Sequence, residues 1–370
     1  MNGIISKVLF FTSPSRAVCI TTTRNIYTKE YLGLGFRQKK QEEGHDKAGK
    51  NVMKIKDSFM TSYKRKGIKN LRRNEIKDFM NLVATDKDMA NLCIVVKDFL
   101  ALTGDPKQKT GLLCDCIQTC YLRRDLKYSR IFSEGDFFQY FDKNPIGKLT
   151  HLQMLYDHGH YQELVEKFKT IPKVGNAANN VIVMASLCRI GTQEAYKQAT
   201  EFLADEIYMQ KEVEGSRTKI LFAWFSIQMG HYDTAIETLR KKEQPYNISE
   251  KIRANVILFA LVKNGKVDIC LSIISNELKK SSKFGFIPTY SYELLREIAK
   301  AVKHDEKLTQ MYKELPNDLE EKGKMDNATI EELVFRPISA SPHSISSDKN
   351  WGYADRPTRV RKLVTYLFDE

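Results

Sequence analysis

A helical motif recurs at a nearly constant interval in the middle of the chain, and this repeat constrains the fold more than any other feature. Four segments carry apolar or small residues at positions i, i+3, i+4 and i+7, the pattern of one helix face. They begin at Tyr161, Tyr196, Tyr232 and Val267, so the intervals are 35, 36 and 35 residues. A second apolar helical run precedes each segment. A repeat of this length built from helix pairs predicts a stacked array in which each pair buries its apolar face against its neighbours.

Glycines mark the turn between the two helices of each unit. Gly159, Gly230 and Gly265 each stand two residues before the second helix, whereas Gly191 stands five residues before it. Glycine commonly ends a helix because it adopts left-handed backbone conformations without a Cβ penalty. Each unit is therefore predicted to consist of a helix, a glycine turn and a second helix. The turn that contains Gly191 is predicted to have gained three residues.

Further helix pairs are expected on both sides of the clear repeats, so residues 74–315 are predicted to form one helical-repeat domain. Residues 316–370 are predicted to contain a short helix at 329–335, a flexible linker rich in Pro and Ser, and a C-terminal tail. The seven cysteines form no even framework, which indicates reduced thiols. No apolar run approaches the length of a transmembrane helix.

The N-terminal part of the chain differs in composition from the rest. Residues 1–29 carry Lys7, Arg16 and Arg24 with no acidic residue, a pattern typical of a mitochondrial transit peptide, with cleavage expected just after residues 24–27. Residues 30–73 are polar and rich in Lys and Gln. They are predicted to form a basic polar arm with little packing of its own.

The chain has a formal net charge of +13, which favours an anionic partner, although a basic background charge explains the composition equally well. The positive charge is densest at the end of the arm. There it is interpreted as a phosphate-contacting patch, with a solvated helix start or linker as the alternative. The residues of this cluster are Lys64, Arg65, Lys66, Lys69, Arg72 and Arg73.

The turn sequences resemble those of pentatricopeptide repeats. Examples are His158-Gly159-His160-Tyr161, Met229-Gly230-His231-Tyr232 and Asn264-Gly265-Lys266-Val267. Tetratricopeptide repeats are similar, but their usual period is 34 residues. The order of leader, basic arm and degenerate array resembles animal mitochondrial members of the pentatricopeptide family. This resemblance implies an all-α, right-handed superhelical α-solenoid of about six degenerate pentatricopeptide-type helix pairs.

The resemblance also implies a function. The expected protein binds single-stranded RNA in the mitochondrial matrix, acts in transcript maturation and stability, and so supports the respiratory chain. A separate RNA-processing enzyme is a further expected partner. In this family the first helices line an RNA groove, and counting back from the turn glycines gives the candidate groove residues Lys148, Thr150, Asn179, Thr218, Lys219 and Arg253.

The usual base-reading positions are occupied here by Thr150, Ile182, Leu221 and Val256. Three of these four side chains are apolar, so we expect binding through phosphates and stacking instead of a code of one base per repeat. Ordinary solvated helix surface remains the alternative for Asn179, Thr218 and Arg253. The alternative function is a tetratricopeptide-like protein scaffold in mitochondria. An RNA adaptor predicts a positive stripe along the groove, and a peptide-binding scaffold predicts a mixed or apolar groove.

The sequence gives no reason to expect catalysis, a metal or a cofactor. The aspartates are scattered over helix pairs, whereas a metallonuclease gathers them around a phosphate. A zinc deaminase would need His-x-Glu followed by Cys-x-x-Cys, and neither motif is present. Cys116 and Cys120 share a helix face that Cys114 does not, which favours buried core thiols over a zinc site.

Overall fold

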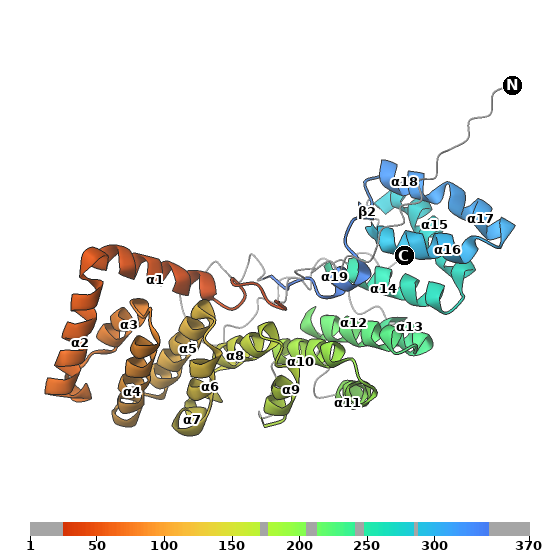
Figure 1. The fold of residues 1–370 in the computed structure, drawn as a ribbon. Coiled ribbons are helices and arrows are strands. Elements are labelled where there is room, and N and C mark those ends of the chain that lie inside the picture. The colour runs from red at the N-terminus through yellow and green to blue at the C-terminus, as the bar shows by residue number, and fades with distance from the viewer. Residues whose placement is uncertain (1–24, 171–176, 205–212, 241–247, 285–287, 340–370) are drawn as a thin grey trace, which may run out of the picture.

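The computed structural model describes residues 25–170, 177–204, 213–240, 248–284 and 288–339. Helices make up most of these residues, which confirms the expected all-α class (Figure 1). The strands found there are β1 (Tyr290–Ser291) and β2 (Met325–Asp326), which pair in parallel. No helix in the same ranges is both long and apolar enough to cross a membrane.

The chain begins with four helices that pack at one end of the molecule. They are α1 (Leu34–Ala48), α2 (Val52–Lys66), α3 (Arg73–Asn81) and α4 (Asp86–Leu102). A series of helix pairs follows. Its helices are α5 (Pro106–Arg123), α6 (Leu126–Ser133), α7 (Phe138–Phe141), α8 (Pro145–Asp157), α9 (Tyr161–Thr170), α10 (Ala177–Ile190), α11 (Gln193–Ala204), α12 (Val213–Gln228), α13 (Tyr232–Arg240), α14 (Ile248–Lys263), α15 (Val267–Phe284), α16 (Tyr292–Val302) and α17 (Glu306–Lys313). The described chain ends with α18 (Leu315–Glu321) and α19 (Ile330–Val334).

Three of the four predicted second helices begin at the residue that the repeat spacing indicates. Helices α9, α13 and α15 begin at Tyr161, Tyr232 and Val267. Helix α11 begins at Gln193, three residues before Tyr196, and the Thr192 hydroxyl accepts a hydrogen bond from the Ala195 N–H at 3.1 Å. The prediction of a longer turn after Gly191 is therefore wrong, because the three additional residues belong to the second helix.

Four of the turns share one hydrogen-bond pattern. The residue after the turn donates its N–H to the carbonyl five residues earlier, as in a Schellman motif: His160 to Leu155, His231 to Ser226 and Lys266 to Leu261, each at 2.8–2.9 Å. Asp125 donates to Cys120 in the same way at 2.9 Å. The left-handed residue of that turn is Arg124, with φ 55°. Arg124 lies 35 residues before Gly159, so α5 and α6 form another copy of the unit.

The first helices of successive pairs pack against one another in chain order, α5 on α8, α8 on α10, α10 on α12, α12 on α14 and α14 on α16 (Figure 1). This arrangement buries them on several sides at once. Every residue is buried from 149 to 156, from 178 to 188 and from 220 to 227. The second helices α9 and α13 bury one face and expose the other. The first helices therefore show continuous apolar runs, and the second helices show the clearer periodicity.

Residues 30–73 are not an unpacked arm. Leu32 and Leu34 are fully buried, and the rings of Phe59 on α2 and Phe79 on α3 stack with centroids 4.6 Å apart. The short helix predicted at 329–335 is present as α19. The expected linker and tail beyond residue 339 lie outside the described residues, as do residues 1–24 of the expected leader.

The left-handed turns give a stability prediction. Gly230 has φ 80°, and a Cβ there would meet open space, so only the backbone opposes a side chain. We expect Gly230→Ala to lower the free energy of unfolding by about 1 kcal/mol. Gly104 also faces open space but lies outside the left-handed region, so Gly104→Ala should not destabilise. Urea denaturation of both variants measures the difference, and equal effects would contradict this explanation of the turns.

Candidate nucleic-acid interface

The predicted basic cluster lies at the turn between α2 and α3. Gly67 ends α2 with φ 67°, and its N–H donates to the Tyr63 carbonyl at 2.8 Å. A 3-10 turn at Ile68–Asn70 follows, so the chain folds back sharply. The side chains exposed at this turn are those of Lys64, Arg65, Lys69 and Arg72, and none of them has an ion-pair partner in the part of the chain that the structure describes. We call these four residues the basic turn. Lys66 lies in the last turn of α2.

Arg73 does not belong to this exposed group. Its guanidinium lies against α5, where a Cβ added to Gly111 would sit 2.8 Å from Arg73 Nη2. The Arg73 Nε is buried without a hydrogen-bond partner among the described residues. Arg73 is half-buried and contributes to the packing of α3 on α5, and its contact with RNA stays a prediction.

The basic turn belongs to a larger positive region. Residues 34–73 contain 13 Lys and Arg against four Asp and Glu. Not all of these cations are exposed: Lys56 is buried, and its Nζ lies 2.7 Å from Asp88 Oδ2. Burial alone would raise the pKa of Asp88, but hydrogen bonds from Lys56 and from the Ala84 and Thr85 N–H groups outweigh it and lower that pKa. Exposed cations on α1 and α2 and between them are Lys39, Lys47, Lys50 and Lys54.

The candidate groove residues on the first helices are mostly not available to a ligand. Thr150, Asn179 and Thr218 are buried, with at most 4 % of each residue exposed. The Thr150 hydroxyl donates to the Ile146 carbonyl within its own helix at 2.8 Å. These three residues are packed inside the protein, so their assignment to an open groove is wrong.

The three charged groove candidates are only partly exposed. Lys148 pairs with Asp142 at 3.3 Å, and the Arg253 Nε donates to the Leu239 carbonyl at 2.7 Å. Lys219 is half-buried. These residues lie on three first helices of the stack, α8, α12 and α14, and the predicted positive stripe stays a prediction.

The face of the first helices is covered by two segments from opposite ends of the described chain, residues 26–28 and residues 330–338, which we call the clasp (Figure 1). The two segments pair in parallel: the Thr28 N–H donates to the Ile338 carbonyl at 3.0 Å, and the Ile338 N–H donates to the Ile26 carbonyl at 2.9 Å. This pairing joins residues more than 300 positions apart in the sequence.

The N-terminal half of the clasp is held by Tyr27, which is fully buried. Its hydroxyl donates to the Ala178 carbonyl on α10 at 2.8 Å, and its N–H donates to Gln153 Oε1 on α8 at 3.2 Å. The expected transit peptide of residues 1–29 therefore overlaps the folded part at residues 25–29. Cleavage after Tyr27 would remove a core side chain.

The C-terminal half of the clasp is held by two arginines. Arg217 on α12 is buried and donates from Nη2 to the carbonyls of Leu333 at 3.2 Å and Arg336 at 2.6 Å. Burial lowers the pKa of Arg217 to about 10. Arg189 on α10 pairs with Glu331 at 2.6 Å and lies 3.9 Å from the centre of the Phe335 ring. Side chains of the first helices thus contact α19 and the residues that follow its C-terminal end.

The structure also holds a buried polar cluster around His151. Its Nδ1 lies 2.8 Å from Ser129 Oγ and its Nε2 lies 3.4 Å from Ser133 Oγ, while Lys167 donates to Ser133 Oγ at 2.7 Å. Burial, with smaller contributions from Lys167 and Arg130, lowers the pKa of His151 well below its usual value. An enclosed, neutral histidine of this kind fastens helices together and has no access to a substrate.

The thiols behave as the sequence indicates. Cys116 and Cys120 are fully buried, and burial raises the pKa of each well above its usual value, which makes the thiolate rare. Within the described ranges no three His, Cys, Asp or Glu side chains are grouped so that they could hold a metal ion.

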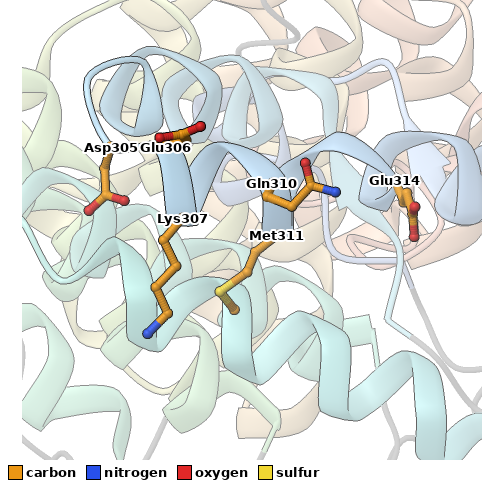
Figure 2. Close-up of a pocket in the computed structure, with 6 residues that line it drawn as sticks. All are labelled: Asp305, Glu306, Lys307, Gln310, Met311 and Glu314. Atoms are coloured by element: carbon orange, nitrogen blue, oxygen red, sulfur yellow. The ribbon is translucent and has the colours of Figure 1, made fainter.

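A shallow hollow lies along α17. Figure 2 shows the six side chains that line it, all from one short stretch of chain: Asp305, Glu306, Lys307, Gln310, Met311 and Glu314. Because all six residues are exposed and no second element encloses them, the hollow offers no shielded site for chemistry.

The chain matches no protein-family model, no curated protein and no solved structure.

The buried histidine gives a pH prediction. The unfolded imidazole titrates near pH 6.5, whereas the folded one stays neutral, so the unfolded state binds the extra proton as the pH falls. Stability should therefore fall as the pH decreases below 6.5, by roughly 1 kcal/mol per pH unit on account of His151. Urea denaturation between pH 6.5 and 4.5 should show this contribution abolished in His151→Asn and retained in the control His304→Asn, whose histidine is exposed. An unchanged pH slope in His151→Asn would contradict it.

Proposed function

We propose that this chain is a non-catalytic single-stranded RNA-binding protein of the mitochondrial matrix, which acts in transcript maturation and stability and so supports the respiratory chain. The observation that carries the proposal is the basic turn, Lys64, Arg65, Lys69 and Arg72, where four exposed cations lack ion-pair partners among the described residues. Such charges gain free energy from a polyanion because binding releases its condensed counterions.

Two further features favour a single strand of nucleic acid. The positive region continues onto α1 and α2 through Lys50 and Lys54, so that an extended polyanion can contact several cations. Phe36 at the start of α1 is 70 % exposed, and the Lys40 ammonium lies 5.6 Å from its ring centre. An exposed ring beside cations can stack on an unpaired base.

The mechanism we propose is passive. The basic turn and the neighbouring lysines hold a transcript by its phosphates, with little selection among bases because phosphate contacts carry no direct sequence information. The held strand is protected from nucleases or presented to a separate RNA-processing enzyme. Neither role requires a catalytic group in this chain.

The remaining parts of the proposal depend on the fold and the leader. The left-handed turns that recur with a spacing of about 35 residues, together with the stacked first helices, support a right-handed superhelical α-solenoid of degenerate pentatricopeptide-type pairs. The mitochondrial location is supported by the acid-free leader with Lys7, Arg16 and Arg24.

A second candidate function is a protein-binding scaffold, and the clasp is the observation that favours it. The first helices use Gln153, Arg189 and Arg217 to bind a non-helical segment and a short helix of the chain, which is the kind of contact that a protein-binding groove makes. In the closed structure this face is occupied by the chain itself, whereas the basic turn is open. We therefore favour the RNA-binding function.

The basic turn can be tested by charge removal. We expect Lys64→Gln, Arg65→Gln, Lys69→Gln and Arg72→Gln together to weaken binding of a fluorescent 20-nucleotide RNA at least tenfold. The slope of log K against log salt should become shallower by about 0.7 for each phosphate that the protein no longer neutralises. Fluorescence anisotropy between 50 and 200 mM salt measures both quantities.

The control removes the same charge from the opposite end of the molecule. Lys303, Lys307, Lys313 and Lys322 are exposed on and around α17 and α18, and replacing them by Gln should leave affinity and slope nearly unchanged. Equal reductions of affinity in the two quadruple variants would show a non-specific charge effect and would contradict the assignment of the basic turn as the RNA-binding site.

A further inference from the structure

The clasp has the properties of a cover that can be released. Its two halves come from opposite ends of the described chain and pair with each other at the bridge between Tyr27 and Ile338. Each half is also attached to a different set of first helices, the N-terminal half to α8 and α10 and the C-terminal half to α10, α12, α14 and α16. Release of either half therefore weakens the hold on the other.

The helices that the clasp contacts, α10 and α12, carry buried polar atoms without hydrogen-bond partners. Asn179 Oδ1 and Trp224 Nε1 are buried and have no hydrogen-bond partner among the residues described. Buried polar groups without partners oppose the closed state. A ligand that supplied a donor to Asn179 and an acceptor to Trp224 would be favoured at this face.

The side chains of the covered face match one class of ligand. Trp224 and Phe259 each stand six residues before a turn glycine, the place that Gln153 holds when it contacts the clasp. Their ring centroids are 6.0 Å apart, and Arg189 and Arg217 lie on the same helix stack. Aromatic faces together with arginines suit the bases and phosphates of an unpaired strand.

We propose that the clasp, residues 26–28 and 330–338, is an autoinhibitory contact that opens as one unit and keeps single-stranded RNA from the face of the first helices. With the clasp closed, RNA reaches the basic turn and the exposed residues of α1 and α2, but not the face of the first helices. With the clasp open, the strand extends from the basic turn onto Trp224, Phe259 and the two arginines. This inference rests on the proposed RNA-binding function for its ligand, but not for the opening itself.

Hydrogen exchange tests the opening without RNA. Tyr27→Phe keeps the buried ring and removes only the hydroxyl that donates to Ala178, and Arg217→Lys keeps the charge and removes the guanidinium that donates to two carbonyls. We expect each variant to speed exchange of the Thr28 and Ile338 amides at least tenfold, while α5 and α8 keep their protection. Tyr292→Phe, which removes an exposed hydroxyl bonded to Glu320, is the matched control and should change neither amide.

Two results would overturn the inference that the clasp opens as one unit: faster exchange confined to the half that carries the substitution, or simultaneous loss of protection in α5 and α8.

Binding of RNA to the face of the first helices is tested by fluorescence anisotropy on the same proteins. Tyr27→Phe and Arg217→Lys should bind a 20-nucleotide RNA at least threefold more tightly than the wild type. Unchanged affinity would overturn autoinhibition. If no protein in the series bound RNA, the proposed function would fail, and the exchange result would still decide whether the clasp opens as one unit.

Discussion

Burial of the first helices on nearly every side is the constraint on which the rest of the structure depends. Helices α8, α10 and α12 each contact the neighbouring first helices and their own second helix, and that leaves one apolar face without cover from the repeat itself. Exposure of that face would cost about 25 cal/mol per Å² of apolar surface. The clasp supplies the missing cover with Ile26, Tyr27, Leu333, Val334 and Phe335, all of which are buried. The array is therefore closed by parts of the chain that do not belong to the repeat.

This closure divides the molecule into two chemically different surfaces. Among the polar side chains of the stacked first helices, Gln153, Arg189 and Arg217 contact the clasp. The positive charge of residues 34–73 lies instead on helices that pack beside the array. The basic turn therefore lies at the end of the molecule and not along the stack of first helices.

Much of the fold follows from local sequence, and the rest does not for identifiable reasons. The period and the turn glycines predict α9, α13 and α15, because both signals depend on residues close together in the chain. Arg124 is missed because a non-glycine residue gives no sign of a left-handed conformation. The clasp is missed because Tyr27 meets Ala178 across 151 positions, and no periodicity reports so distant a contact. The packing of residues 30–73 is missed because their many lysines hide the few apolar positions on α1 and α2. The basic cluster is visible in the sequence, since exposure of charge needs no distant partner, whereas the burial of Thr150, Asn179 and Thr218 depends on how the first helices pack with elements far along the chain.

The central claim is that RNA is held at the basic turn and its neighbouring helices, and ultraviolet crosslinking in intact mitochondria tests it most directly. The full chain would be purified with its crosslinked RNA, and the crosslinked peptides would be identified by mass spectrometry. The account predicts recovery of RNA, with crosslinks concentrated between residues 36 and 73. Absence of crosslinked RNA, or crosslinks confined to α15–α18 at the opposite end, would contradict it.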